Sequence, residues 1–289
     1  MSWAETPTAR LSRDGKLRLT HGPIDVLITG EGPAQAVRAA YQRAHRAFAP
    51  VLTDLVAELP RLRSATGPAP AGQVAQRMQC AVASFAQHFV TPMAAVAGAV
   101  ADHLLAAMLT PGHGLSRAFV NNGGDIALWT GAAPFRIAIC EDPVTAQPGA
   151  RATVGAEVGG VATSGWRGRS HSLGIADAVT VLARNAATAD AAATLIANAV
   201  DLPGHPAITR QPANDLSPDS DLGQRLVTTD VGRLSATEAE RALGSAADLA
   251  DAWRKSGLIT AACLACQGAR RMIGPLAPPS AILKEPAHA

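Results

Sequence analysis

The longest apolar stretch of the chain, Met93 to Leu109, places the strongest limit on what this sequence can fold into. It reads MAAVAGAVADHLLAAML, and the charged or polar residues Asp102 and His103 interrupt it. The stretch is too short and too polar for a good membrane-spanning helix, so we expect a helix buried inside a globular domain. Hydrophobic residues make up 48% of the chain but aromatic residues only 3%, which predicts a core of closely apposed helices and sheet.

Charge and the N-terminal sequence narrow the classes of partner. The formal net charge is +2, and no run of Lys and Arg interleaved with aromatic residues occurs, which argues against nucleic acid as a partner. The N-terminus, Met-Ser-Trp-Ala-Glu-Thr-Pro, has neither a signal-peptide pattern nor a lipidation cysteine, so a cytoplasmic location and no membrane partner are expected. Cys263 and Cys266 form a lone CxxC pair, which favours two small buried residues over a redox or metal role.

Helical and strand patterns are interleaved without a regular βαβ rhythm, which favours an α+β fold with a mixed sheet and packed helices. We expect one domain over residues 1–289. Strands are expected at 16–20, 24–29, 126–129 paired with 135–140, 158–162, 177–183 and finally 258–267. Helices are expected at 34–60 with a break at Pro50, at 73–109 with a restart at Pro92, at 188–200, and from a Ser235–Glu238 capping box to Lys255. Loops are expected at 61–73 and, as a long polar surface loop, at about 205–227.

Asp190 and Thr194 stand four residues apart near the start of an alanine-rich helix. Residues at this spacing share one helical face, so a carboxylate and a hydroxyl could bind one hard cation together. The segment Ala162-Thr-Ser-Gly165, earlier in the chain, supplies further backbone and hydroxyl oxygens. The alternative for Asp190 is an ordinary acid near a helix N-terminus, where the helix dipole favours it.

A glycine turn and a Thr-Ser-Gly turn could complete a phosphate site. The glycine turn is open enough for a phosphate to approach, although Asn-Gly and Gly-Gly are also ordinary hairpin dipeptides. The Thr-Ser-Gly turn can equally be a plain strand exit whose hydroxyl groups cap the next element. The candidate residues of the two turns are Asn122, Gly123, Gly124 and Asp125, and Thr163, Ser164 and Gly165. Their combination with the Asp190 pair indicates a metal-assisted phosphate site.

Four motifs follow one another in a fixed order: Gly123-Gly-Asp-Ile126, Ala162-Thr-Ser-Gly165, Ala178-Val-Thr-Val-Leu-Ala183 and Ala189-Asp-Ala-Ala-Ala-Thr194. In this order and spacing, residues 118–200 resemble the FAD:protein FMN transferase superfamily, the ApbE-like proteins. The whole chain is similar to a shorter, cytoplasmic branch of that superfamily. The marks of that branch are Thr91-Pro-Met-Ala-Ala-Val-Ala-Gly98, Thr163-Ser-Gly-Trp-Arg-Gly-Arg-Ser-His-Ser-Leu-Gly174 and Ser220-Asp-Leu-Gly223.

The resemblance implies an α+β fold of the tunnelling-fold type, in which FAD lies in a cleft and Mg²⁺ bridges its pyrophosphate. It implies Mg²⁺ ligands at Asp190 and Thr194 and at a backbone carbonyl near Ala162, with Gly123, Gly124 and Asp125 lining the flavin nucleotide site. In these transferases a Thr or Ser hydroxyl of an acceptor flavoprotein attacks the FMN-side phosphate, and AMP leaves.

The chain departs from the transferases after the Thr-Ser-Gly turn, because their Asp-Pro-x-Thr-Gly loop is absent and His171-Ser-Leu-Gly174 runs directly into a strand. His171 is the candidate general base for an attacking hydroxyl or water, or alternatively a histidine that bonds a neighbouring loop. Arg167 and Arg169 are candidate ligands for phosphate or another anion, with surface charge as the alternative.

The leading hypothesis is therefore Mg²⁺-dependent transfer of FMN from FAD to a protein Ser or Thr. One alternative is hydrolysis of the FAD pyrophosphate to FMN and AMP. Another is a non-transferase protein that binds a flavin, or a different anionic ligand through Arg167 or Arg169. A homo-oligomer with a cleft shared between subunits also stays open.

Overall fold

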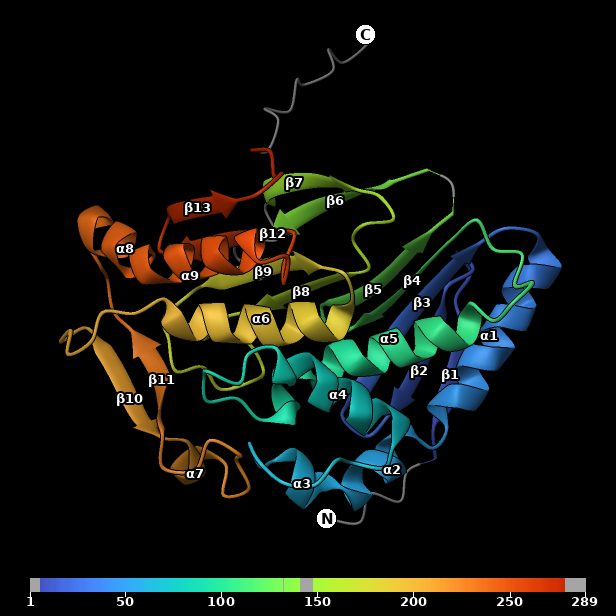
Figure 1. The fold of residues 1–289 in the computed structure, drawn as a ribbon, viewed down its shortest axis with the longest axis horizontal. Helices are drawn as coiled ribbons and strands as arrows, with labels where there is room; N and C mark the ends of the chain where they lie inside the picture. The colour runs from blue at the N-terminus through green and yellow to red at the C-terminus, as the bar shows by residue number, and fades with distance from the viewer. Residues whose placement is uncertain (1–5, 132, 141–147, 279–289) are drawn as a thin grey trace, which may run out of the picture.

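A nine-stranded sheet forms the centre of the computed structural model, which describes residues 6–131, 133–140 and 148–278 (Figure 1). The strand order is β1-β2-β3-β4-β5-β8-β9-β12-β13, and neighbouring strands are antiparallel throughout. Helices are interleaved with these strands in the chain but produce no parallel pair in this sheet. The expected α+β fold is confirmed.

The strands of the central sheet are β1 (Thr8–Leu11), β2 (Leu17–His21), β3 (Ile24–Glu31), β4 (Arg117–Asn122), β5 (Asp125–Thr130), β8 (Gly160–Ser164), β9 (Ala178–Ala183), β12 (Ala261–Cys266) and β13 (Ala269–Ile273). Two further antiparallel pairs stand apart, β6 (Phe135–Cys140) with β7 (Pro148–Val154), and β10 (Ile208–Pro212) with β11 (Leu226–Val231). The helices are α1 (Ala34–Phe48), α2 (Val51–Ala57), α3 (Leu59–Leu62), α4 (Gln73–Ala83), the 3₁₀ helix η1 (Pro92–Ala95), α5 (Val96–Met108), α6 (Ala186–Ala199), α7 (Ala213–Leu216), α8 (Ala236–Ala242) and α9 (Gly244–Lys255).

The sheet separates two hydrophobic clusters. On one face, α1, α4, α5, α6 and α9 cover the strands and form the larger core, with α5 and α6 lying across the middle of the sheet (Figure 1). On the other face, the β6–β7 pair packs over the smaller cluster around Leu128, Val161 and Leu182. The expected buried helix in the Met93–Leu109 stretch is α5, and no helix of the described residues is long and apolar enough to cross a membrane.

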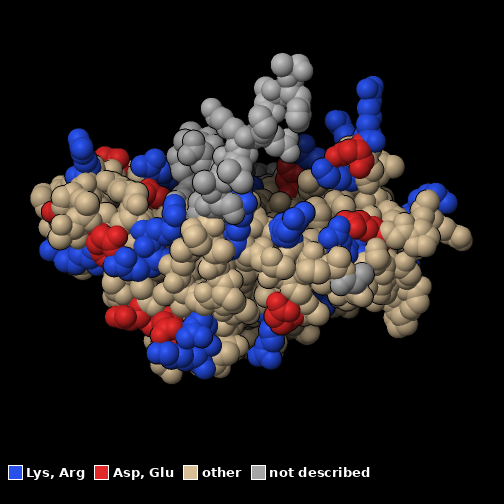
Figure 2. Space-filling view, turned by 90° about the horizontal axis from the view of Figure 1, so that it is seen from above, with Lys and Arg blue, Asp and Glu red and all other residues tan. Residues whose placement is uncertain are grey.

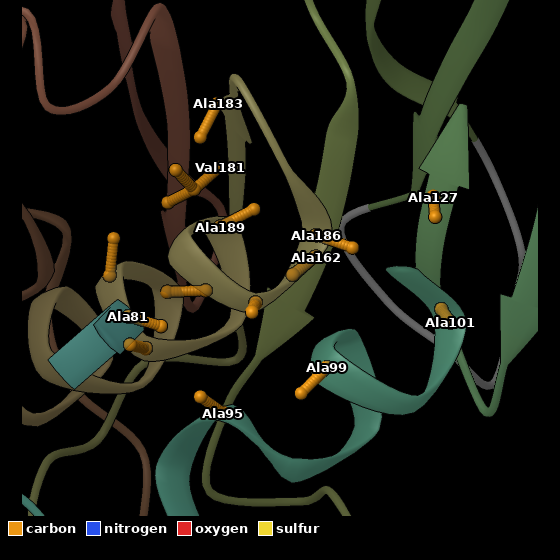
Figure 3. Close-up of a cluster of buried hydrophobic side chains, with 14 of the residues drawn as sticks. Ala81, Ala95, Ala99, Ala101, Ala127, Ala162, Val181, Ala183, Ala186 and Ala189 are labelled. Atoms are coloured by element: carbon orange, nitrogen blue, oxygen red, sulfur yellow. The ribbon is translucent and has the colours of Figure 1, made fainter. Parts of the chain in front are cut away.

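Alanine dominates the contact between α5, α6 and the sheet, as Figure 3 shows for Ala99, Ala162, Ala186 and Ala189. Small side chains let the backbones approach closely. Gly98 is one point of close approach between α5 and α6, where an added Cβ would overlap the backbone of Ala186. The core therefore contains few aromatic residues because α5 and α6 lie too close together to leave room for large side chains between them.

Several predicted elements need correction. The strands at 126–129 and 135–140 do not pair, because β4 and β8 occupy both edges of β5 and β6 pairs with β7 instead. The region 205–227 is not all loop, because it contains β10, the short helix α7 and the start of β11, which pairs with β10. Its polar residues lie on the exposed faces of these elements. The helix from Ser235 keeps its capping box but divides into α8 and α9, and the strand at 258–267 is followed by one more, β13.

The CxxC pair lies on β12, where Cys263 belongs to the smaller hydrophobic cluster and Cys266 to the larger one. Residues three apart on a strand point to opposite faces of a sheet, so these two thiols cannot bind one metal or form one disulfide. Burial raises the pKa of Cys263 to about 11 and that of Cys266 to about 12. The expectation of two small buried residues is confirmed.

Charged side chains are dispersed on the face seen in Figure 2, where Lys and Arg alternate with Asp and Glu among uncharged residues. On the described part of this face, neither sign forms one continuous field. The N-terminal residues 1–5, which entered the prediction of a cytoplasmic location, lie outside the described residues.

Candidate functional site

The glycine turn is a two-residue hairpin between β4 and β5. Asn122 and Asp125 are paired across it, and Gly123 and Gly124 adopt φ values of 67° and 114°, in the left-handed region that glycine tolerates. The buried Asn122 side chain donates from Nδ2 to the carbonyl of Ala97 at 3.1 Å, just inside the first turn of α5. The hairpin interpretation of this motif is therefore confirmed, and the Asn122 contact joins the hairpin to the first turn of α5.

The Thr-Ser-Gly turn ends β8 beside that hairpin. Pairing between β5 and β8 covers only Ile126 with Val161 and Ala127 with Gly160, and beyond it the backbone N–H of Thr163 donates to the Asp125 carboxylate. Backbone groups of successive strand residues point to alternate edges. Thr163 therefore faces β5, whereas the carbonyl predicted as a ligand, that of Ala162, belongs to the edge paired with β9. A backbone ligand from β8 at the Asp125 side is better supplied by Thr163.

Helices α5 and α6 cap one another with aspartates. Asp190 of α6 accepts hydrogen bonds from the N–H groups of Ala97 and Gly98 in the first turn of α5, the latter at 3.0 Å. Asp102 of α5 accepts from Ala186 at 3.0 Å and Ala187 at 2.9 Å in the first turn of α6. The free N–H groups at a helix start need such acceptors, and the helix dipole favours negative charge there. Asp190 therefore caps a neighbouring helix, while Asn185 caps its own.

The carboxylates of Asp125 and Asp190 act on one another electrostatically. Burial raises the pKa of Asp125 to about 7, against the hydrogen bond from Thr163 and the positive charge of Arg169. Burial also raises the pKa of Asp190 well above its ordinary value, and the nearby charges of Asp125 and Asp102 raise it further. Burial and mutual repulsion of this kind favour protonation of one carboxyl group or a nearby cation.

These residues fit a hard divalent cation. Carboxylate and hydroxyl oxygens are the ligands that Mg²⁺ prefers, and Mg²⁺ in nucleotide sites uses one or two carboxylates together with phosphate and water oxygens. Asp125 and Asp190 supply the carboxylates, and Thr194 follows Asp190 by one helical turn. Within the described ranges, no three His, Cys, Asp or Glu side chains gather as a metal cluster.

The loop after Gly165 brings the predicted arginines to different places. Arg169 lies over the hairpin, where an added Cβ at Gly123 would overlap its guanidinium group. Its charge lowers the pKa of Asp125, so this arginine faces the site. Arg167 instead lies 3.7 Å from Asp177 and stacks over Trp166 at 4.9 Å. The expectation of an anion ligand fits Arg169, whereas Arg167 already has a partner within the protein.

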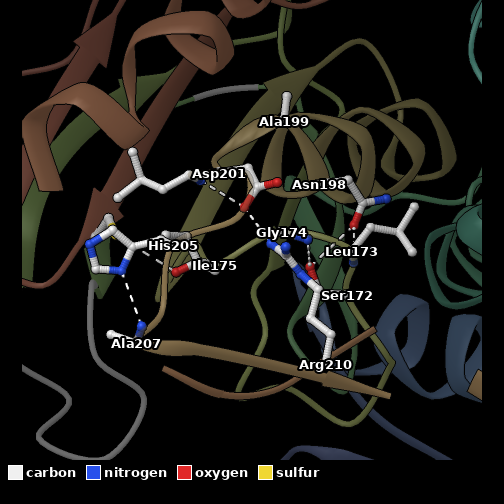
Figure 4. Close-up of polar contacts among 12 residues, drawn as sticks. Ser172, Leu173, Gly174, Ile175, Asn198, Ala199, Asp201, His205, Ala207 and Arg210 are labelled. Atoms are coloured by element: carbon white, nitrogen blue, oxygen red, sulfur yellow. Dashed lines mark hydrogen bonds and ion pairs between the residues drawn. The ribbon is translucent and has the colours of Figure 1, made fainter. Parts of the chain in front are cut away.

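A buried polar contact fixes the next part of the loop (Figure 4). Asn198, near the end of α6, accepts through Oδ1 from the Ser172 hydroxyl at 3.1 Å and from the Leu173 N–H at 2.9 Å. Gly174 packs so closely against α6 that a Cβ would overlap the carbonyl of Ala197. His171 therefore projects from a loop that is held against α6, and its Nε2 lies 3.3 Å from the hydroxyl oxygen of Ser217.

Sequence reasoning missed three residues around this region. Asp102 was assigned no role because its cap is formed with a helix 84 positions away in the chain. Thr91 and Asp221 belong to motifs that were noted without a role, and the buried Thr91 hydroxyl donates to Asp221 at 2.5 Å. This bond links the segment after α7 to the start of η1. In the sequence, the only signals for this hydrogen bond are the Thr-Pro and Ser-Asp-Leu-Gly motifs that contain its two residues.

The antiparallel sheet covered by helices makes this an α+β protein, and its candidate site contains two buried carboxylates near a glycine hairpin. Among protein families, a model described as AbpE bacteria matches residues 8–272. The chain belongs to this family, and the expected membership of the ApbE-like superfamily is confirmed.

Similarity to individual proteins is more limited. A UPF0280 protein of Methanothrix thermoacetophila is 39% identical over 121 residues, which cover 38% of this chain and 46% of that protein. The chain thus spans about half the length of such curated relatives. Among solved structures, the apo flavinyl transferase ApbE of Pseudomonas stutzeri shares 15% identity over 66% of this chain and 82% of its own, with a TM-score of 0.38. The ApbE protein of Thermotoga maritima shares 14% identity over 66% and 87%, with a TM-score of 0.39.

Proposed function

We propose that this protein binds FAD together with Mg²⁺ and transfers FMN to a Ser or Thr hydroxyl of an acceptor flavoprotein. The observation that carries the proposal is a pair of buried carboxylates that act on one another electrostatically, Asp125 and Asp190, together with the glycine hairpin and Arg169. A cytoplasmic location and action on a separate flavoprotein belong to the same proposal. Membership of the family supports flavin-related chemistry in general.

Each residue would have a separate task. Asp125, Asp190 and Thr194 would hold Mg²⁺, which neutralises charge on a pyrophosphate as its phosphorus is attacked. Glycine at position 124 leaves that side of the hairpin backbone open, so that a phosphate could approach it, whereas the Arg169 guanidinium group lies at Gly123. Arg169 carries a guanidinium group that pairs well with phosphate oxygens.

His171 would accept the proton of the attacking hydroxyl. Its Nε2 already lies within 3.3 Å of a hydroxyl oxygen, which is the contact a general base needs. The absent Asp-Pro-x-Thr-Gly loop favours a second candidate, in which water replaces the acceptor and FAD is hydrolysed to FMN and AMP. Acceptor-independent release of AMP would identify that reaction.

Purified protein should release AMP from FAD when Mg²⁺ and a flavoprotein acceptor are present, with flavin becoming covalently attached to the acceptor. The Asp125→Asn variant should lose at least a factor of 10 in this rate, because one cation ligand is weakened. Asp248→Asn, an exposed change on α9, is the matched control and should keep the rate. Unchanged FAD turnover in Asp125→Asn would contradict the proposed site, and absence of FAD binding would contradict the flavin function.

A further inference from the structure

The candidate base His171 is already paired with a hydroxyl of its own chain. Ser217 follows directly after α7, and its Oγ lies 3.3 Å from Nε2 of His171 although 46 positions separate the two residues. With the ring proton on Nδ1, Nε2 accepts from this hydroxyl. The Ser217 side chain is half-buried, so it is shielded and still accessible to a ligand. A hydroxyl beside a histidine base is the arrangement of an activated nucleophile.

The segment that carries Ser217 is fixed beside the candidate site by several contacts. Asp221 bonds the Thr91 hydroxyl at 2.5 Å, and Thr91 caps η1, which leads into the first turn of α5 where Asp190 binds. The Ser220 N–H donates to the Ser217 carbonyl at 2.8 Å, which holds the turn between them. On the opposite side, the loop of His171 also carries Arg169, which lies over the glycine hairpin.

An unpartnered polar atom supports a ligand in this area. Asn214 lies in α7, one helical turn before Ser217, and its buried Oδ1 has no hydrogen-bond partner among the residues that the structure describes. Trp166, in the loop of Arg169 and His171, likewise buries its Nε1–H without an acceptor. Buried polar groups are normally paired, so both segments that carry His171 and Ser217 hold a polar atom able to accept a further partner or donate to one.

We propose, on the basis of the proposed function, that Ser217 is itself an acceptor of FMN and that the protein flavinylates its own chain. The Ser217 oxygen attacks the FMN-side phosphorus of FAD, and a new phosphoester bond forms between them. The bond from that phosphorus to the bridging oxygen breaks, and AMP leaves with its electron pair. The hydroxyl proton passes to Nε2 of His171. One FMN group becomes attached to the chain for each AMP released, without an oxidant or reductant.

The test is to incubate the full-length protein with FAD and Mg²⁺ without any acceptor. Covalent flavin is then measured by fluorescence of the denatured protein, intact mass and peptide mapping, and AMP is measured in parallel. We expect one flavin on the peptide that contains Ser217 and an equal amount of AMP. Ser217→Ala should remove the covalent flavin, Ser217→Thr should retain it, and Ser220→Ala, which removes a nearby hydroxyl, should leave it unchanged.

The outcomes separate this inference from the function on which it rests. AMP release without covalent flavin, or flavin attached at another residue, would overturn Ser217 as acceptor and leave FAD turnover intact. Flavin transfer to an added flavoprotein, with no flavin attached to this chain, would likewise overturn Ser217 as acceptor. If FAD neither binds nor turns over with or without acceptor, both proposals fall. Melting temperatures of the Ser217 variants show whether a lost signal reflects unfolding.

Discussion

The carboxylate of Asp190 both caps α5 and faces Asp125. At the sequence level these were rival interpretations, a cation ligand or an ordinary acid near a helix start. The structure joins them, since the carboxylate occupies the start of a different helix and still approaches a second carboxylate. A helix N-terminus beside the site also adds positive potential that favours a phosphate.

The Asp190→Ala variant should therefore lose both folding stability and ligand binding, whereas Asp102→Ala should lose folding stability alone. Loss of either cap should lower the free energy of unfolding by about 0.5–2 kcal/mol. Only Asp190→Ala should also abolish the rise in melting temperature that FAD and Mg²⁺ produce in the parent protein. Thermal unfolding with and without both ligands checks this, and an equal ligand effect in the two variants would show that Asp190 has a capping role alone.

Asp102 should also make stability depend on pH. Burial raises its pKa to about 6 in the folded protein, above the ordinary value of 3.8, so the folded state holds the proton more strongly than the unfolded chain. The contribution to stability is complete below about pH 3.8 and is lost as pH rises through about 6. Urea unfolding at several pH values should show a smaller decline over this window in Asp102→Asn. An identical decline in the variant would refute the assignment.

At the scale of elements, the sequence predicted most of what local patterns determine. Pro50 ends α1, Thr91 and Pro92 start η1, and the Ser235–Glu238 capping box starts α8. Pairing partners could not be predicted, because the choice of β4 and β8 as neighbours of β5 depends on contacts distant in the chain. For the same reason the sequence identified Asp125 and Asp190 as candidates but did not predict that they face one another, nor that Ser217 reaches His171.

The crossing of α5 and α6 depends on Gly98. Its replacement by alanine should lower the free energy of unfolding by about 1–3 kcal/mol, because the new methyl group overlaps the backbone of Ala186. Gly244→Ala is the matched control, since a Cβ in the first turn of α9 meets nothing within 4 Å and should be neutral or stabilising. Chemical denaturation of both variants measures the difference. Equal stabilities would mean that the two helices separate at little cost.

At the scale of the whole molecule, the sheet divides the core and so decides the behaviour of the cysteines. Cys263 and Cys266 face opposite clusters, and burial raises the pKa of each thiol, so neither should react in the folded protein. A thiol reagent should modify the exposed Cys80 in the native state and reach these two only after denaturant is added. Rapid native reaction of Cys263 or Cys266, traced by peptide mapping, would contradict this arrangement.

The short pairing between β5 and β8 has a mechanical consequence. Among the described residues, β5 and β8 are joined by two residue pairs, by a backbone hydrogen bond from Leu128 to Gly159 and by the hydrogen bond from the Thr163 N–H to the Asp125 carboxylate. The backbone pairing between the two halves of the sheet is therefore short. Asp125 belongs to the half that ends at β5, whereas Thr163 and Asp190 belong to the other half with its covering helix α6. The caps of Asp102 and Asp190 already join α5 of one half to α6 of the other, and a nucleotide and cation bound at Asp125 and Asp190 would add a further link between the two halves.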